Sequence, residues 1–403
     1  MANLLYLVHR LPYPPNKGDK VRSFNLLKHL AKQHQIFLGT FIDDPEDEAY
    51  LDAVKSYCAD VYVARLSPRW GKLRSLTGLL TGEALSLPYY RDGGLRQWVQ
   101  HTISAAPIDK AVIFSSVMAD YLDDMASLPT LVDFVDMDSA KWTQYASTHA
   151  WPLSWLYRRE GSRLLAFERA VAMRARRSFF VTDAETDLFR RAAPETADRV
   201  EAICNGVDSD FFAPENAGES PYPADITPVV FTGAMDYWPN VDGAIWFAND
   251  ILPALRARHP ELRFYVVGRN PDPAVNALAA DSALGTVVTG TVDDVRPYIA
   301  HAAVIVAPLR IARGIQNKVL EAMAMARPVV ATANCAAPIE AKVGDELLAA
   351  ADIAEFITEI ESLLADRARG DAIGRNARAR VIAGYSWDAH LSRLDSYLEP
   401  TRP

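Results

Sequence analysis

Short apolar runs alternate with stretches of helical periodicity along almost the whole chain of 403 residues. In the first half, apolar runs begin at Asn3 and recur over residues 36–42, 111–116, 130–136 and 178–182. A segment with helical spacing of apolar residues separates the first two runs, and an order of strand, helix, strand forms a parallel sheet covered by helices. The sequence therefore predicts a doubly wound α/β fold.

A second alternating series follows a stretch that is rich in turn residues. This stretch, ICNGVDSDFFAPENAGESPYPAD, combines Pro, Gly and acidic residues and indicates a domain boundary. The runs PVVFTGA, RFYVVG, TVVTGTV, VIVAPL and PVVATA then alternate with helical patterns. We expect two Rossmann-like domains, 1–205 and 206–385, each binding ligands at the carboxyl ends of its strands.

Composition excludes several classes of protein. The net charge is −9, whereas nucleic-acid binders that neutralise phosphates need a surplus of Lys and Arg, so we expect no nucleic-acid partner. The three cysteines are widely spaced, which argues against a disulfide framework or a zinc cluster. The first apolar run is too short for a signal peptide or a membrane span, so we expect a cytoplasmic protein.

The most informative stretch is VIVAPLRIARGIQNKVLEAMAMARPVVAT, residues 304–332. A strand is followed by a loop around Arg313 and Gly314, and a helix then begins near Ile315, Gln316 and Asn317. The first backbone N–H groups of a helix lack internal partners and lie at the positive end of its dipole. They can therefore hold a diphosphate.

Charged side chains in the same stretch suit a nucleotide-sugar donor. Lys318, in the first turn of that helix, can neutralise a phosphate oxygen, as can Arg310 or Arg313 from the loop. Glu321, one turn further on, can accept hydrogen bonds from both hydroxyls of a ribose. Stabilisation of a leaving diphosphate by such groups can replace a metal ion, so we expect no metal and no cofactor besides the donor.

Here the sequence resembles glycosyltransferase family 4, whose mark is a pair of glutamates with seven residues between them, followed by A-M-A and G-x-P-V-V-A. Glu321 matches the second glutamate, and Arg313 stands in the place of the first. NGVD at 205–208 resembles the interdomain motif of the family, and Gly233 stands where the family places a glycine beside the donor phosphates.

The resemblance implies the GT-B fold: two Rossmann-like domains facing across a cleft, with the final helix, 386–403, crossing back to the first. It also implies transfer with retention of the anomeric configuration, and it favours a UDP-sugar over a GDP-sugar. The candidate catalytic residues are Arg313, Lys318, Glu321 and Asp136. The candidate donor-binding residues are Gly18, Gly233, Arg310, Gly314, Ile315, Gln316, Asn317 and Glu321.

Three further segments narrow the resemblance. HRLPYPPNKGDKVRSFNLLKHLA, LTGEALSLPYY and VDFVDMDSAKW resemble a sugar transferase subgroup found with bacterial exopolysaccharide and exosortase loci. This resemblance implies a lipid-linked or polysaccharide acceptor at the inner face of the membrane.

The first domain offers two candidate clusters. Gly18, with Lys17 or Lys20 beside it, can meet a ligand phosphate, but a Pro-Pro-Asn-x-Gly run is equally typical of a solvated turn. Asp136 and Asp138 form a D-x-D pair that, with Asp133, either orients an acceptor hydroxyl or fixes the loop, and a helix-capping role is at least as well supported.

Several other residues have a structural and a functional interpretation. Residues 69–82 suit an amphipathic helix on an anionic membrane, although packing on the first domain is the favoured interpretation. We expect Glu168 on a solvated helix face, His9 as a structural hydrogen-bonding residue and Trp238 in core packing rather than beside the donor.

Other functions remain alternatives. A sugar-nucleotide epimerase would use the donor alone, and a non-catalytic sugar-nucleotide or glycan-binding protein would fit the missing first glutamate. A dinucleotide oxidoreductase is the least favoured, because no G-x-G-x-x-G follows the first strand of either domain.

Overall fold

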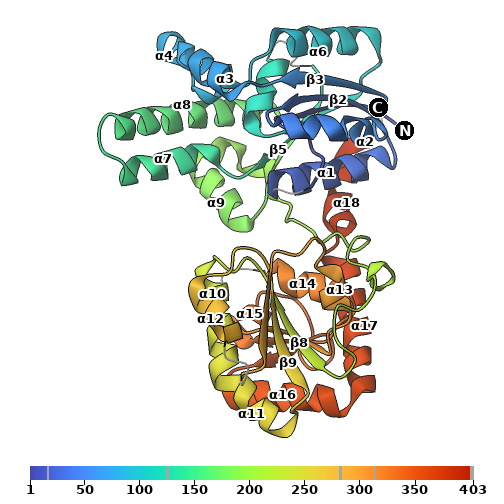
Figure 1. The fold of residues 1–403 in the computed structure, drawn as a ribbon. Helices are drawn as coiled ribbons and strands as arrows, with labels where there is room; N and C mark the ends of the chain where they lie inside the picture. Colours follow the sequence, from blue (N-terminus) through green and yellow to red (C-terminus); the bar gives the residue numbers. More distant parts are fainter. Residues whose placement is uncertain (16–17, 124–126, 281–283, 313–314, 400–403) are drawn as a thin grey trace. The chain divides into compact units, whose positions relative to one another are not determined.

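The computed structural model describes residues 1–15, 18–123, 127–280, 284–312 and 315–399. The chain forms two compact units: unit 1 is Met1–Asn205 with the segment from His390 onward, and unit 2 is Gly206–Ala389. Each unit holds one parallel sheet with helices packed against it (Figure 1). The prediction of two Rossmann-like α/β units is confirmed.

Unit 1 contains a seven-stranded sheet in the order β3-β2-β1-β4-β5-β6-β7, and all its strand pairs are parallel. The sheet is apolar on both faces, since β4 is buried along its whole length and β1 from its second residue onward. The strand order reverses between β1 and β4, where ligands of doubly wound sheets bind. The strands are β1 Asn3–Val8, β2 Gln35–Ile42, β3 Asp60–Arg65, β4 Lys110–Phe114, β5 Thr130–Val135, β6 Arg177–Phe180 and β7 Val200–Ala202.

The helices of unit 1 include two groups beyond the simple alternation. Three short helices, α3 to α5, lie between β3 and α6, and α7 and α8 form a helical hairpin after β5 (Figure 1). The helices are α1 Gly18–Ala31, α2 Leu51–Lys55, α3 Pro68–Ser75, α4 Thr77–Thr81, α5 Ser86–Tyr89, α6 Gly93–Ala105, α7 Asp138–Thr148, α8 Leu153–Arg174 and α9 Asp183–Ala192.

Unit 2 contains a six-stranded sheet in the order β10-β9-β8-β11-β12-β13, again with parallel pairs throughout. Its order reverses between β8 and β11. The strands are β8 Thr227–Thr232, β9 Leu262–Val267, β10 Thr286–Gly290, β11 Val304–Ala307, β12 Val329–Thr332 and β13 Leu348–Ala350. The helices are α10 Trp238–Trp246, α11 Leu252–Arg258, α12 Pro273–Ala280, α13 Arg296–Ala300, α14 Asn317–Ala324, α15 Ala333–Ala336, α16 Ile353–Ala365 and α17 Arg367–Gly384.

The last helix, α18 (Trp387–Leu398), begins in unit 2 and ends in unit 1. Its unit 1 part is tied to the first domain by polar contacts: Asp395 Oδ1 lies 2.8 Å from His29 Nε2, and Arg393 Nη1 donates to the carbonyl of Ala202 at 2.9 Å. The expected return of the final helix to the first domain is therefore confirmed.

Candidate functional site

Two glycines hold the switch point of the unit 2 sheet together. Gly233 follows β8 and Gly268 follows β9, and their φ angles are +157° and +153°. A Cβ on Gly268 would lie 1.7 Å from the carbonyl oxygen of Gly233, so the two backbones touch. A Cβ on Gly233 would lie 2.9 Å from Lys318 Nζ. Only glycine, which has no side chain, allows the two loops and the ammonium group of Lys318 to lie this close together.

Lys318 is held at this point by groups from two other segments. Its ammonium donates to Oδ1 of Asn240, a buried residue of α10 whose own amide donates to the carbonyl of Ala234 at 2.8 Å. The ammonium also lies 4.6 Å from the ring centroid of Phe231. Burial lowers the pKa of Lys318 to about 8, although the nearby Glu321 opposes this shift. A lysine held in this way is ready to pair with an anion.

Glu321 lies one helical turn after Lys318 in α14. Burial raises the pKa of Glu321 to about 7, and the ammonium of Lys318 offsets part of that effect. Titratable groups whose environments move their pKa values toward neutrality are typical of functional sites. Lys318 and Glu321 thus lie together, as the sequence predicted, at the carboxyl edge of the sheet.

The helix start beside them matches the predicted position. Helix α14 begins at Asn317, with Gln316 as its N-cap in an extended conformation. Asn317 is exposed, and so is Ile315. Two predicted residues of this loop, Arg313 and Gly314, lie outside the described residues.

The structure also places Arg310, a predicted donor-binding residue, and Trp238, which was expected in core packing. Arg310 forms an ion pair with Asp242, with its Nε 3.0 Å from Oδ2, so its charge is already partly balanced. Trp238 and its neighbour Tyr237 are exposed at the start of α10, so the prediction of core packing for Trp238 is wrong. The next three residues of α10 are buried, so the exposure is particular to Tyr237 and Trp238.

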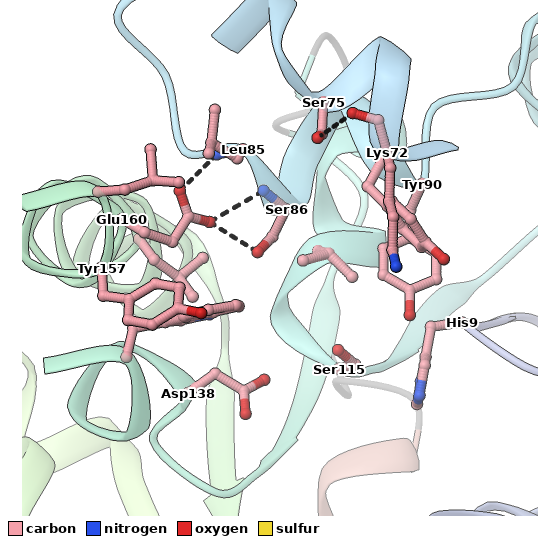
Figure 2. Close-up of a pocket in the computed structure, with 15 residues that line it drawn as sticks. His9, Lys72, Ser75, Leu85, Ser86, Tyr90, Ser115, Asp138, Tyr157 and Glu160 are labelled. Carbon is pink, nitrogen blue, oxygen red and sulfur yellow. Dashed lines mark hydrogen bonds between the residues drawn. The ribbon is translucent and has the colours of Figure 1, made fainter. Parts of the chain in front are cut away.

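Unit 1 has a pocket of about 490 Å³ at the corresponding edge of its sheet, close to the switch point (Figure 2). His9, directly after β1, and Ser115, directly after β4, contribute to its lining. The remaining lining comes mainly from the additional helices: Lys72, Ser75, Leu85, Ser86, Tyr89, Tyr90, Val117, Asp138, Trp142, Leu156, Tyr157, Glu160 and Leu164. Aromatic rings and a few polar groups around a concave space suit a sugar-containing or amphipathic ligand.

A buried glutamate fixes two walls of this pocket to each other. Glu160 of α8 accepts hydrogen bonds from the backbone N–H groups of Leu85 and Ser86, at 2.6 and 2.9 Å, and from the hydroxyl of Ser86 at 2.7 Å (Figure 2). These bonds satisfy donors at the start of α5 and join it to α8. The pocket is therefore preformed.

The backbone at the ends of β4 and β5 is strained. Ser115 and Val135 have φ angles of +73° and +69°, and a β-branched residue such as valine rarely adopts this conformation. Such strain concentrates at functional sites. Ser115 also lines the pocket.

Of the three predicted aspartates, the structure buries Asp133 and leaves Asp136 and Asp138 partly exposed. Asp133 pairs with Arg22, whose Nε lies 2.7 Å from Oδ2, so it fixes the structure. Lys141 donates to both Asp136, at 2.8 Å, and Asp138, at 3.2 Å. Of these two, Asp138 lines the pocket (Figure 2).

The other first-domain candidates also have defined places. Gly18 begins α1 and is exposed, and a Cβ there would meet no atom within 4 Å. Lys20 is buried against Asp47 at 2.6 Å, so it is not available to a phosphate. Lys17 lies outside the described residues. His9 lines the pocket, and its Nδ1 has no hydrogen-bond partner among the described residues, although its Nε2 lies 3.5 Å from Asp19.

The prediction of a solvated position for Glu168 is wrong. Its side chain is buried and accepts hydrogen bonds from the backbone N–H and the hydroxyl of Ser139, at 3.2 and 2.5 Å. Desolvation raises its pKa to about 8 against the effect of these bonds. Glu168 caps α7 from α8, a contact that its mid-helix position in the sequence does not reveal.

Sequence reasoning missed the aromatic pocket residues Tyr89, Tyr90, Trp142 and Tyr157, and it missed Asn240 as the partner of Lys318. A signal existed for Tyr89, Tyr90 and Trp142, because LTGEALSLPYY and VDFVDMDSAKW stood out as distinctive segments. The others lie in ordinary helical patterns.

A family model matches part of unit 2. Residues 227–366, which lie within unit 2, match the family model for glycosyl transferases group 1. A search of curated proteins found no match.

Solved structures of similar fold cover nearly the whole chain. They include sucrose-phosphate synthase from Thermosynechococcus elongatus, with 18% identity, a TM-score of 0.60 and coverage of 99% of this chain and 98% of that one. Anabaena HepE in complex with UDP has 16% identity, a TM-score of 0.59 and coverage of 99% of both chains. A Rickettsia africae glycosyltransferase has 12% identity, a TM-score of 0.61 and coverage of 98% and 97%. The chain thus has the GT-B fold, and the family match supports a glycosyltransferase.

Proposed function

We propose that this protein is a retaining, metal-independent glycosyltransferase that takes its sugar from a nucleoside diphosphate and passes it to a lipid-linked or polysaccharide acceptor. The observation that carries the proposal is the cluster of Lys318, Glu321 and Gly233 beside the start of α14. It combines a cation, a carboxylate, a close backbone approach and a helix N-terminus, which are the groups that a diphosphate and a ribose require.

In the proposed reaction, the bond between the anomeric carbon and the diphosphate oxygen breaks, and the electron pair leaves with the diphosphate. Lys318 and the first N–H groups of α14 stabilise the charge that develops on it. An acceptor hydroxyl forms the new bond to the anomeric carbon, and its proton passes to an oxygen of the leaving diphosphate. Glu321 holds the ribose through its two hydroxyls.

A UDP-sugar is the donor that the comparisons favour. HepE, a structural neighbour, has been solved with UDP and with UDP-glucose. The resemblance of the sequence to exopolysaccharide-associated transferases points to a role in polysaccharide synthesis. The pocket of unit 1, with its aromatic lining and the carboxylate of Asp138, is the acceptor site in this proposal.

The first test is a thermal-shift panel of sugar nucleotides, without added metal and again with EDTA. We expect one nucleotide family to raise the melting temperature in both conditions, and Glu321→Ala to abolish the shift. Glu219→Ala, at an exposed position of unit 2, is the matched control and should behave as wild type. A shift that requires metal would contradict the metal-independent mechanism, and no shift with any nucleotide would remove the proposed function.

The second test follows the product by NMR. A retaining transferase gives a product with the anomeric configuration of the donor and consumes no donor without an acceptor beyond slow hydrolysis. Conversion of the donor alone into an isomer would instead identify an epimerase.

A further inference from the structure

Two segments of unit 1 expose large apolar side chains. Helices α3 and α4 expose Trp70, Leu73, Leu76, Leu79 and Leu80, of which Trp70 is 72% and Leu80 is 91% exposed. The start of α8 and the turn before it expose Trp151, Leu153 and Trp155, with Trp151 at 79%. Apolar surface concentrated in this way marks an interaction site.

The two segments lie next to each other. Arg159 of α8 donates through Nη2 to the carbonyl of Gly78 in α4 at 2.6 Å. Trp155 is one helical turn before Arg159 and lies on the same face of α8. Leu79 and Leu80 directly follow Gly78. Figure 1 shows α3, α4 and the α7–α8 turn reaching the same side of unit 1.

The charges around these residues are positive. Residues 67–82 and 149–159 contain no Asp or Glu, although the whole chain carries a net charge of −9. Arg69 and Lys72 are exposed in the first segment and Arg158 in the second. The nearest acidic residue of α8, Glu160, is buried in its bonds to α5. Exposed cations thus flank the exposed apolar residues on an acidic protein, and Glu83, which follows the first segment, is paired with Arg91.

We propose that these two segments together bind an anionic lipid bilayer. We call their exposed residues the docking surface: Trp70, Leu73, Leu76, Leu79, Leu80, Trp151, Leu153 and Trp155, with the cations Arg69, Lys72 and Arg158. Tryptophans at the headgroup level, leucines below them and Arg or Lys at the rim are the composition of interfacial membrane-binding segments. Within the ranges that the structure describes, no helix is both long enough and apolar enough to cross a membrane. The proposed attachment is peripheral, through the exposed side chains of these two segments. For residues 69–82 the sequence offered a membrane surface as the alternative to packing on the first domain, and the structure adds the α8 segment.

The docking surface also borders the acceptor pocket. That pocket is lined by Lys72 and Ser75 of α3 and by Leu156 and Tyr157 of α8. Residues of the docking surface lie between or next to these lining residues in the sequence. If the proposed function holds, docking brings the pocket to the lipid surface, and the acceptor is a membrane-borne saccharide. The docking itself does not depend on the transfer reaction.

The test is flotation of the full chain with vesicles. Phosphatidylcholine vesicles are compared with vesicles that also contain phosphatidylglycerol. We expect flotation with the anionic vesicles only, and a loss at high salt because the attraction is partly electrostatic.

Substitutions in each segment sharpen the test. Trp70→Ser with Leu80→Ser, and separately Trp151→Ser with Trp155→Ser, should each remove most of the flotation. Arg69→Gln and Arg158→Gln should each weaken binding about fivefold. Met173→Ser, at the far end of α8 and 49% exposed, is the matched control and should float as wild type. All these side chains are exposed, so the melting temperature should not change.

The outcomes separate this proposal from the proposed function. Glu321→Ala should float as wild type, and the docking variants should keep the thermal shift with sugar nucleotides. Absence of flotation by the wild-type chain, or equal flotation of the paired variants, would overturn the docking surface. If the same variants convert a dimer into a monomer in light scattering without any lipid binding, the surface covers a second copy and the proposal is wrong.

Discussion

Units 1 and 2 are both built on a doubly wound parallel sheet with a candidate site at its switch point, but the two candidate sites differ. In unit 2 the loops touch, and Gly233 leaves no room beside Lys318 for even one methyl group. In unit 1 the additional helices line a pocket of about 490 Å³ beside the switch-point edge of the sheet. The sheet thus supplies the position of a site, and the connections decide its chemistry. A close-fitting polar edge suits a nucleotide diphosphate, and a wide aromatic pocket suits a variable acceptor.

The largest effect is expected from a substitution that breaks the close contact between Gly233 and Gly268 in unit 2. Gly268→Ala places a methyl group 1.7 Å from the carbonyl oxygen of Gly233, and we expect a loss on the order of 3 kcal/mol in the free energy of unfolding. Gly290→Ala is the control, because its φ is +68° but its Cβ would meet open space. Gly290→Ala should lower the free energy of unfolding by about 1 kcal/mol. Urea denaturation measures both, and equal losses would contradict the close contact.

The next effect concerns Glu168, a buried glutamate of unit 1. The pKa of Glu168 is raised to about 8, so the native state retains a proton that the unfolded state releases from about pH 4.5 upward. Stability therefore falls as pH rises through this window and levels off above it. Glu168→Gln mimics the protonated form and should be more stable than wild type at pH 9.

The same two proteins should be equally stable below about pH 4.5, where both states of wild type are protonated. Glu46→Gln, at an exposed position, should show no such dependence on pH. A pH-independent difference between Glu168→Gln and wild type would show that Glu168 is already ionised in the native state.

The polar edge of unit 2 should make donor binding depend on pH. Glu321 must be ionised to accept two hydroxyl hydrogen bonds, and Lys318 must be protonated to pair with a phosphate. Their pKa values of about 7 and about 8 predict the tightest binding of UDP-glucose between these two values. Affinity should fall about tenfold per pH unit on the acidic side. Calorimetric titration measures this affinity at each pH. In Glu321→Gln the affinity should no longer fall at acidic pH.

The pocket of unit 1 should affect the acceptor alone. Trp142→Ala removes a ring that packs against Tyr157 with centroids 5.3 Å apart. We expect KM for the acceptor to rise about tenfold, the value of one lost aromatic contact, while the affinity for the donor stays unchanged. A change in donor affinity instead would contradict the division of labour between the units.

The smallest effect is a gain in stability. Ala326, in the loop before β12, has a φ of +54°, a conformation that costs alanine more than glycine. Ala326→Gly should raise the free energy of unfolding by about 0.5 kcal/mol. Ala354→Gly, in the first turn of α16, should lower it by about as much. The pair is measured by denaturation under identical conditions.

The sequence predicted the features that depend on local pattern. The apolar runs located β1, β8 and β11, and the stretch around Lys318 located the start of α14, because strand and helix periodicity are visible in a single segment. Three strands were missed: β3 is mostly exposed or half-buried, and β7 and β13 have only three residues each, too few to show a period.

Features that depend on distant residues could not be predicted. Asn240 reaches Lys318 across 78 positions, and Glu168 reaches Ser139 across 29. The pocket of unit 1 draws on segments from His9 to Leu164, so no single motif describes it. Burial of a polar side chain is decided by tertiary packing, which explains why Glu168 was wrongly placed on a solvated face.

The most direct test of the central claim is calorimetric titration of UDP into wild type, Lys318→Met and Trp142→Ala in the presence of EDTA. We predict that UDP binds wild type and Trp142→Ala with equal affinity and that Lys318→Met binds it at least tenfold more weakly, because a charge-assisted hydrogen bond is lost. Equal binding by Lys318→Met, or weakened binding by Trp142→Ala, would contradict the assignment of the donor site to unit 2.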